Sequence, residues 1–121
     1  MPIVDIEIVL KPDETISNEM TSEFADQFGT IFGSPKNGTW VKVHGISNLH
    51  YAENGGKVEG GYPVFVSILK ARLPASEEMQ REIDAIIEAV AQICRRDPAF
   101  VHVIYQPEGN RRVAFGGKIV E

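Results

Sequence analysis

The chain has 121 residues, of which 43% are hydrophobic and 24% charged, and its formal net charge is −5 at pH 7. This length suits one globular domain with an apolar core, and the acidic balance argues against nucleic acid or an anionic membrane as a partner. No apolar stretch approaches the roughly 20 residues of a membrane span, and the single cysteine, Cys94, excludes an internal disulfide. We therefore expect a cytoplasmic protein.

The first half of the chain predicts a strand, a helix and a second strand. After Met1 and Pro2, apolar residues alternate with Asp5 and Glu7, which predicts a strand at about 2–10 with one buried face. Ser17 is a good N-cap for a helix that Gly33 ends. A second strand is predicted over 40–47, followed by a glycine-rich turn at 54–61. The helix carries one apolar face, formed by Met20, Phe24, Phe28, Ile31 and Phe32.

The second half repeats this order, with a strand at 63–70, a helix at 76–95 that Asp97-Pro98 ends, and a strand at 100–106. Cys94 falls on the apolar face of this helix, so we interpret it as a core residue and not as a reactive thiol. Short segments recur at a nearly constant spacing of about 60 residues. The matching positions are Pro2 with Pro63, Ser17 with Ser76, Trp40 with Phe100, and the segment Gly55-Gly56-Lys57-Val58 with Gly116-Gly117-Lys118-Ile119.

The doubled pattern predicts an α/β (α+β) fold made of two β-α-β units, about 2–61 and 62–121, within one domain. A right-handed crossover makes the two strands of each unit parallel neighbours. Two units side by side give a four-stranded mixed sheet with both helices on one face. Because two helices cannot cover both faces, we expect the other face to be buried against further subunits.

The chain resembles the tautomerase superfamily over essentially its whole length. The resemblance lies in the order of its elements, which are a proline, a strand, a helix, a strand and a Gly-Gly tail, and in the doubling of this unit. The repeat length is similar to that of 4-oxalocrotonate tautomerase. The overall size resembles 5-carboxymethyl-2-hydroxymuconate isomerase and macrophage migration inhibitory factor. The resemblance implies a homotrimer without a cofactor, a small-molecule carboxylate as substrate, and an amino-terminal proline as the catalytic residue.

Pro2 fits that role if Met1 is removed, because its nitrogen then becomes a secondary amine. Tautomerisation of a 2-oxo or 2-hydroxydienoic acid needs a base of near-neutral pKa, a cation for the carboxylate, and donors for the developing enolate. Burial and neighbouring cations both lower the pKa of an amine. Pro63 follows Tyr62 and is a tertiary amide, so one site per chain is predicted. If Met1 persists, Pro2 is an amide too and the base is absent.

The substrate-binding candidates follow from the resemblance. Arg72 lies just past the strand at 63–70, where relatives carry a carboxylate-binding arginine, and Lys42 matches a functional arginine in the shorter relative. Arg111 and Arg112 either reach an incoming anion or flank a turn, and Phe115 resembles the aromatic of an apolar wall near the proline. Each cation has a plain structural alternative, either as a solvated loop charge or as an ordinary strand residue.

Two other functions stay open. A cationic Pro2 would act as an acid in a hydratase, dehalogenase or decarboxylase of three-carbon acids, and a chain that keeps Met1 would be a non-catalytic trimeric binding protein. No metal site is predicted, because one cysteine and three histidines without ligand spacing do not form one. The paired glycines lack the pattern of a phosphate-binding loop, so no nucleotide is expected either.

Overall fold

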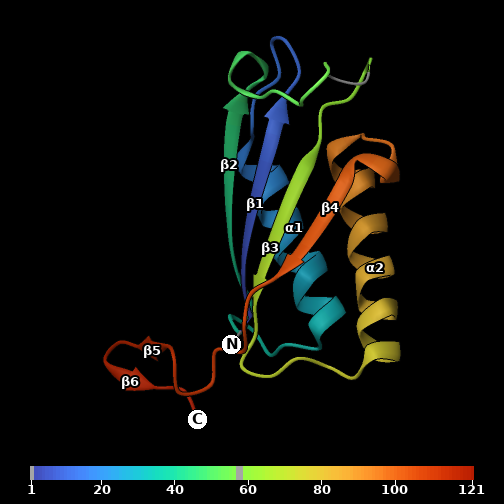
Figure 1. The fold of residues 1–121 in the computed structure, drawn as a ribbon. Coiled ribbons are helices and arrows are strands. Elements are labelled where there is room, and N and C mark those ends of the chain that lie inside the picture. Colours follow the sequence, from blue (N-terminus) through green and yellow to red (C-terminus); the bar gives the residue numbers. More distant parts are fainter. Residues whose placement is uncertain (1, 57–58) are drawn as a thin grey trace.

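A four-stranded sheet with two helices on one face forms the body of the protein (Figure 1). The computed structural model describes residues 2–56 and 59–121. Met1 and residues 57–58 lie outside this part. The predicted removal of Met1, and the predicted repeat match at Lys57-Val58, therefore also lie outside the described residues. The elements are β1 (Ile3–Leu10), α1 (Asn18–Phe32), β2 (Trp40–Ser47), β3 (Val64–Leu69), α2 (Ser76–Cys94), β4 (Val101–Tyr105), β5 (Ala114–Phe115) and β6 (Lys118–Ile119).

The strand order β2-β1-β3-β4 makes the sheet mixed. β1 pairs with β2 in parallel, and β3 pairs with β4 in parallel. β1 and β3 meet in antiparallel orientation at the centre, with Ile3 opposite Leu69. The predicted fold class, including the helices on one face, is therefore confirmed.

Local sequence accounts for the ends of the helices. The Ser17 hydroxyl accepts a hydrogen bond from the Met20 amide at 3.1 Å, and Gly33 ends α1 in the left-handed conformation (φ 63°). The predicted span of α2, 76–95, agrees with the structure within one residue, but Asp97-Pro98 is not what ends the helix. α2 ends at Cys94, because Arg95 takes the left-handed cap (φ 56°), and Asp97 instead caps a short 3-10 turn at Pro98–Phe100.

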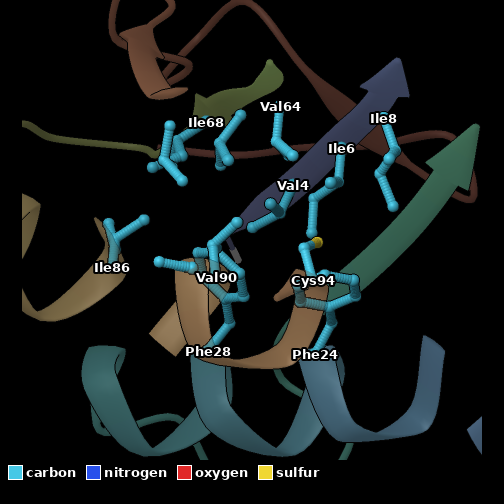
Figure 2. Close-up of a cluster of buried hydrophobic side chains, with 13 residues drawn as sticks. Val4, Ile6, Ile8, Phe24, Phe28, Val64, Ile68, Ile86, Val90 and Cys94 are labelled. Carbon is cyan, nitrogen blue, oxygen red and sulfur yellow. The ribbon is translucent and has the colours of Figure 1, made fainter. Parts of the chain in front are cut away.

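The core lies between the sheet and the two helices (Figure 2). Alternate residues of β1, namely Val4, Ile6 and Ile8, point toward the helices and are fully buried or nearly so. They pack with Phe24 and Phe28 of α1 and with residues of β3 and α2, which are Val64, Val66, Ile68, Ile86, Val90 and Cys94. Cys94 is only 2% exposed, which confirms it as a core residue, and burial raises the pKa of its thiol to about 11.

Within the part of the chain that the structure describes, the opposite face of the sheet carries no helix (Figure 1). Its rows combine charged and apolar side chains, with Lys42 opposite Asp5, His44 opposite Glu7, and Phe65 opposite His102. Trp40 and Ile104 are each 49% exposed there. We call this surface the open face. The short hairpin β5–β6 projects away from the body, beside the start of β1 (Figure 1).

Candidate functional site

Pro2 is fixed at the edge of the molecule where β1 and β2 both begin. The amide of Trp40 donates a hydrogen bond to the Pro2 carbonyl at 3.0 Å, directly before Ile3 enters the sheet opposite Trp40. Pro2 is half-buried. The backbone at Pro2 is thus tied to the start of β2.

Trp40, whose amide binds the Pro2 carbonyl, belongs to an aromatic pair. Phe115 of the β5–β6 hairpin packs edge-on against Trp40, with ring centroids 4.8 Å apart and an angle of 62° between the planes. The Trp40 indole N–H donates to the Asn37 carbonyl at 3.0 Å, which fixes the ring. Gly116 and Gly117 have φ values of 56° and 87°, so this tight turn requires the freedom of glycine. Phe115 therefore packs on the residue whose amide binds the Pro2 carbonyl, and its role in a wall near the proline stays a prediction.

Sequence reasoning did not identify Trp40 as a site residue. The β-α-β repeat contained the signal for Trp40. In such a unit the two strands are parallel neighbours, so the residue that begins the second strand lies beside the residue that begins the first. In the structure, Ile3 lies opposite both Trp40 and Leu69, so these three side chains form the first row of the open face.

A cavity of about 130 Å³ lies at the same end of the sheet. It is lined by Leu69, Gln106, Pro107, Glu108, Gly109, Arg112 and Val113. A larger hollow of about 610 Å³ lies at the end of α1, and none of the predicted site residues lines it. The smaller cavity is the better candidate for the site, because Leu69 is the cross-strand partner of Ile3 and Arg112 supplies a positive charge.

The three arginines are placed differently. Arg112 lines the cavity, whereas Arg111 occupies a left-handed turn position (φ 61°) with an exposed side chain. Arg72 is exposed in the loop after β3, and its neighbour Ala71 accepts a hydrogen bond from the Asn110 amide at 3.2 Å. The loop with Arg72 therefore runs beside the segment that carries Arg111 and Arg112.

Lys42 lies apart from this cavity. Its ammonium pairs with the Asp5 carboxylate at 3.2 Å on the open face, and His44 Nε2 lies 3.9 Å from the same oxygen. Lys42 is two residues along β2 from Trp40, a rise of roughly 7 Å. Its charge is directed toward Asp5, so the geometry favours Arg112 and Arg72 over Lys42 as partners of a carboxylate.

A second feature that sequence reasoning missed is a polar network beneath the site. Glu82 of α2 accepts hydrogen bonds from the Lys70 ammonium at 2.8 Å and from the Tyr105 hydroxyl at 2.5 Å. Burial and the hydrogen bond to Glu82 both raise the pKa of Tyr105 far above its ordinary value. No spacing in the sequence links these three positions.

Among the described residues, no three His, Cys, Asp or Glu side chains are grouped to hold a metal ion. Within the same residues, no helix has the length and apolar character needed to cross a membrane. The candidate site combines Pro2 and the Trp40–Phe115 pair with a cavity whose lining includes Arg112, Gln106 and Glu108.

The fold matches solved structures of a fused 4-OT, a macrophage migration inhibitory factor and a malonate semialdehyde decarboxylase. A wild-type fused 4-OT, described as a symmetric trimer, is 13% identical, with 98% of this chain and 94% of that chain covered and a TM-score of 0.78. Macrophage migration inhibitory factor from Oncomelania hupensis is 11% identical, with 100% and 83% covered and a TM-score of 0.78. FG41 malonate semialdehyde decarboxylase, inhibited by 3-bromopropiolate, is 15% identical, with 94% and 88% covered and a TM-score of 0.68.

No family model and no curated protein matches the sequence. The structural matches show that the chain shares the fold of these proteins, which confirms the resemblance seen in the sequence at the level of fold. Identities this low do not show which reaction the chain performs, because one fold accommodates several chemistries.

Proposed function

We propose that the protein is a cofactor-independent tautomerase that acts on a small 2-oxo or 2-hydroxydienoic acid, with Pro2 as the catalytic residue after Met1 removal. The observation that carries this proposal is the hydrogen bond from the Trp40 amide to the Pro2 carbonyl. This bond ties the Pro2 backbone to that of Trp40, whose ring packs on Phe115, and the cavity that Arg112 lines is at the same end of the sheet.

In the proposed reaction, the neutral Pro2 nitrogen removes the proton from the enol oxygen and returns a proton to carbon as the ketone forms. Arg112 and Arg72 hold the carboxylate, and a guanidinium suits this task because it offers paired N–H donors. In this proposal Arg112 also stabilises the developing enolate charge. Arg111 and Lys42 are kept as secondary candidates that assist with the anion.

Several side chains at this end of the sheet favour such a base. An α-amino group titrates near 7.7–8.0, and a proline terminus has to lose its proton at working pH to act as a base. Apolar walls and a nearby guanidinium both disfavour the protonated amine. Trp40, Phe115 and Leu69 supply the apolar walls at this end of the sheet, and Arg112 supplies the cation.

The assembly we propose is a homotrimer that buries the open face. Exposed Trp40 and Ile104 need cover, and the mixed charges of Asp5, Glu7 and Lys42 can pair between subunits. The fused 4-OT of the same fold is described as a trimer. A cavity of 130 Å³ is small for a ligand pocket, which a neighbouring subunit would complete. Light scattering should give three times the 13.4 kDa chain mass, and a monomer at micromolar concentration would contradict this assembly. A cytoplasmic location remains part of the proposal.

Pro2→Ala tests the reaction, with Pro63→Ala as the matched control. Ketonisation of phenylenolpyruvate or of a 2-hydroxydienoate should fall roughly 10²- to 10⁴-fold in Pro2→Ala, the usual contribution of a general acid or base. Pro63→Ala should keep the wild-type rate per folded chain, because Pro63 is buried in the second unit as an amide. Equal rates for Pro2→Ala and the wild type, or an intact mass that retains Met1, would refute the mechanism.

The pH–rate profile separates tautomerase chemistry from the other reactions of this fold. With Pro2 as a base, kcat/KM should rise with pH as the amine loses its proton. A hydratase, dehalogenase or decarboxylase that uses a cationic proline as an acid would instead lose activity as the pH rises and the proline loses its proton. Arg112→Ala should raise KM for the carboxylate substrate, and an unchanged KM would exclude Arg112 from binding.

A further inference from the structure

Beneath the candidate site, one carboxylate joins three elements of the fold. Glu82 of α2 accepts from Lys70 at the end of β3 and from Tyr105 at the end of β4. The side chains of Lys70 and Glu82 are only 18% and 12% exposed. The Lys70 ammonium also lies 4.8 Å from the centroid of the Phe32 ring of α1. The ammonium is thus held from both helices.

Lys70 connects this network to the backbone of the site. Its carbonyl accepts from the Gly109 amide at 2.8 Å, and the next carbonyl, of Ala71, accepts from Asn110 at 3.2 Å. The Leu73 amide donates to the Glu108 carboxylate at 2.7 Å. These bonds fasten the loop 70–73, which carries Arg72, to the segment 108–110, which leads into Arg112.

We infer that Glu82 and Lys70 are positioning residues that fix the two arginine-bearing segments and thereby set the affinity of the site for a carboxylate. The inference deepens the proposed function and rests on it. A partly buried ion pair adds little net stability compared with apolar residues of the same volume. Its directional hydrogen bonds instead hold the loop in one place, and ligand-binding groups need support of this kind.

The structure also contains a matched control. Glu14 forms a comparable carboxylate–cation pair with Arg96 at 2.6 Å, but at the end of β1 away from Pro2, where Arg96 also binds the Val9 carbonyl. Glu14→Gln therefore makes the same chemical change as Glu82→Gln without touching the loop 70–73. If the Glu82–Lys70 pair only stabilised the fold, Glu82→Gln and Glu14→Gln would have similar effects on substrate binding.

The test measures KM and kcat together with binding of phenylglyoxylate, a 2-oxo acid that cannot enolise because it has no α-carbon proton. Binding is followed by the fluorescence of Trp40, the single tryptophan of the chain. Glu82→Gln and Lys70→Met should raise KM and the phenylglyoxylate Kd roughly 5- to 20-fold while kcat changes less than about twofold, the pattern expected when binding to substrate and transition state is lost equally. Lys70→Arg should restore both values toward those of the wild type.

Three results would overturn the inference. These are an unchanged Kd and KM in Glu82→Gln, an equal rise in Glu14→Gln, or no measurable phenylglyoxylate binding by the wild-type chain. Failure of the proposed function is recognised separately. It would appear as full turnover in Pro2→Ala, whereas the phenylglyoxylate Kd does not depend on Pro2 chemistry and reports on the arginine segments alone.

Discussion

Replacing Arg96 by methionine should destabilise the fold far more than replacing an exposed arginine. The Arg96 side chain is 1% exposed, and its guanidinium donates to three backbone carbonyls, those of Val9, Tyr62 and Cys94. It also forms a bidentate pair with the Glu14 carboxylate, with both distances at 2.6 Å. One side chain therefore joins the ends of β1 and α2 to the start of β3.

The expected loss in the free energy of unfolding is about 3–5 kcal/mol, the cost of removing one partner from a buried ion pair. The Glu14 side chain is 20% exposed, so water can solvate its carboxylate again in part, and we expect a value near the lower limit. A loss of this size is a large fraction of the roughly 5–15 kcal/mol that stabilises a typical domain.

The pair also predicts how stability depends on pH. Burial raises the pKa of Glu14, but the hydrogen bonds from Arg96 and the Lys11 amide and the charges of Arg96 and Lys11 lower it by more, so the net shift is downward. A carboxylate with a lowered pKa in the folded state stabilises the protein above its unfolded pKa of about 4.3. This stability is lost as the pH falls through the folded pKa. The extra acid sensitivity of the wild type should be absent in Arg96→Met.

Urea unfolding at fixed protein concentration, followed by Trp40 fluorescence and far-UV circular dichroism, measures both effects. Arg81→Met is the control, because Arg81 is an exposed arginine of α2 and its loss should change stability by no more than about 0.5 kcal/mol. The reasoning is refuted if Arg96→Met costs no more than Arg81→Met at pH 7, or if both variants retain the wild-type loss of stability in acid.

Four smaller predictions follow from local geometry. Arg95→Gly should stabilise the protein by roughly 1 kcal/mol, because Arg95 holds a left-handed cap (φ 56°) that glycine adopts without strain; a lower melting temperature would contradict this. Ser17→Ala should cost about 1 kcal/mol by removing the N-cap hydrogen bond of α1, and an unchanged urea midpoint would show that the cap contributes nothing. Cys94, 2% exposed and with a pKa of about 11, should react with a thiol reagent at pH 8 only after unfolding, whereas rapid labelling of the native protein would show that the core opens. Phe115→Ala should shift the Trp40 emission to longer wavelength by exposing the ring to water, and an unchanged spectrum would mean that the hairpin does not dock on Trp40 in solution.

Much of the fold follows from short-range patterns. The alternation around Asp5 and Glu7 predicted β1 within one residue at its start, and the Ser17 cap and Gly33 predicted both ends of α1. Such signals depend on neighbours in the chain, so the sequence alone contains them. Arg95 shows their limit, because its left-handed conformation ended α2 although no glycine stood there.

The candidate site was predictable only in part. Pro2 and Phe115 were identified through the order of repeated elements, and their roles remain predictions. The sequence offered Arg111 and Arg112 as equivalent candidates, and the turn at Arg111 distinguishes them, because it leaves Arg112 to line the cavity. Lys42 was indistinguishable from a site cation until the register placed it opposite Asp5.

By itself, the sequence determined two β-α-β units, the parallel pairing within each, and the apolar faces that pack into the core, because hydrophobic period and caps act over a few residues. Only the tertiary structure decided that β1 and β3 meet at the centre, that Phe115 packs on Trp40, and that Glu82 joins Lys70 to Tyr105. These contacts join residues far apart in the chain, and they form only where the packed sheet and helices bring their partners within reach.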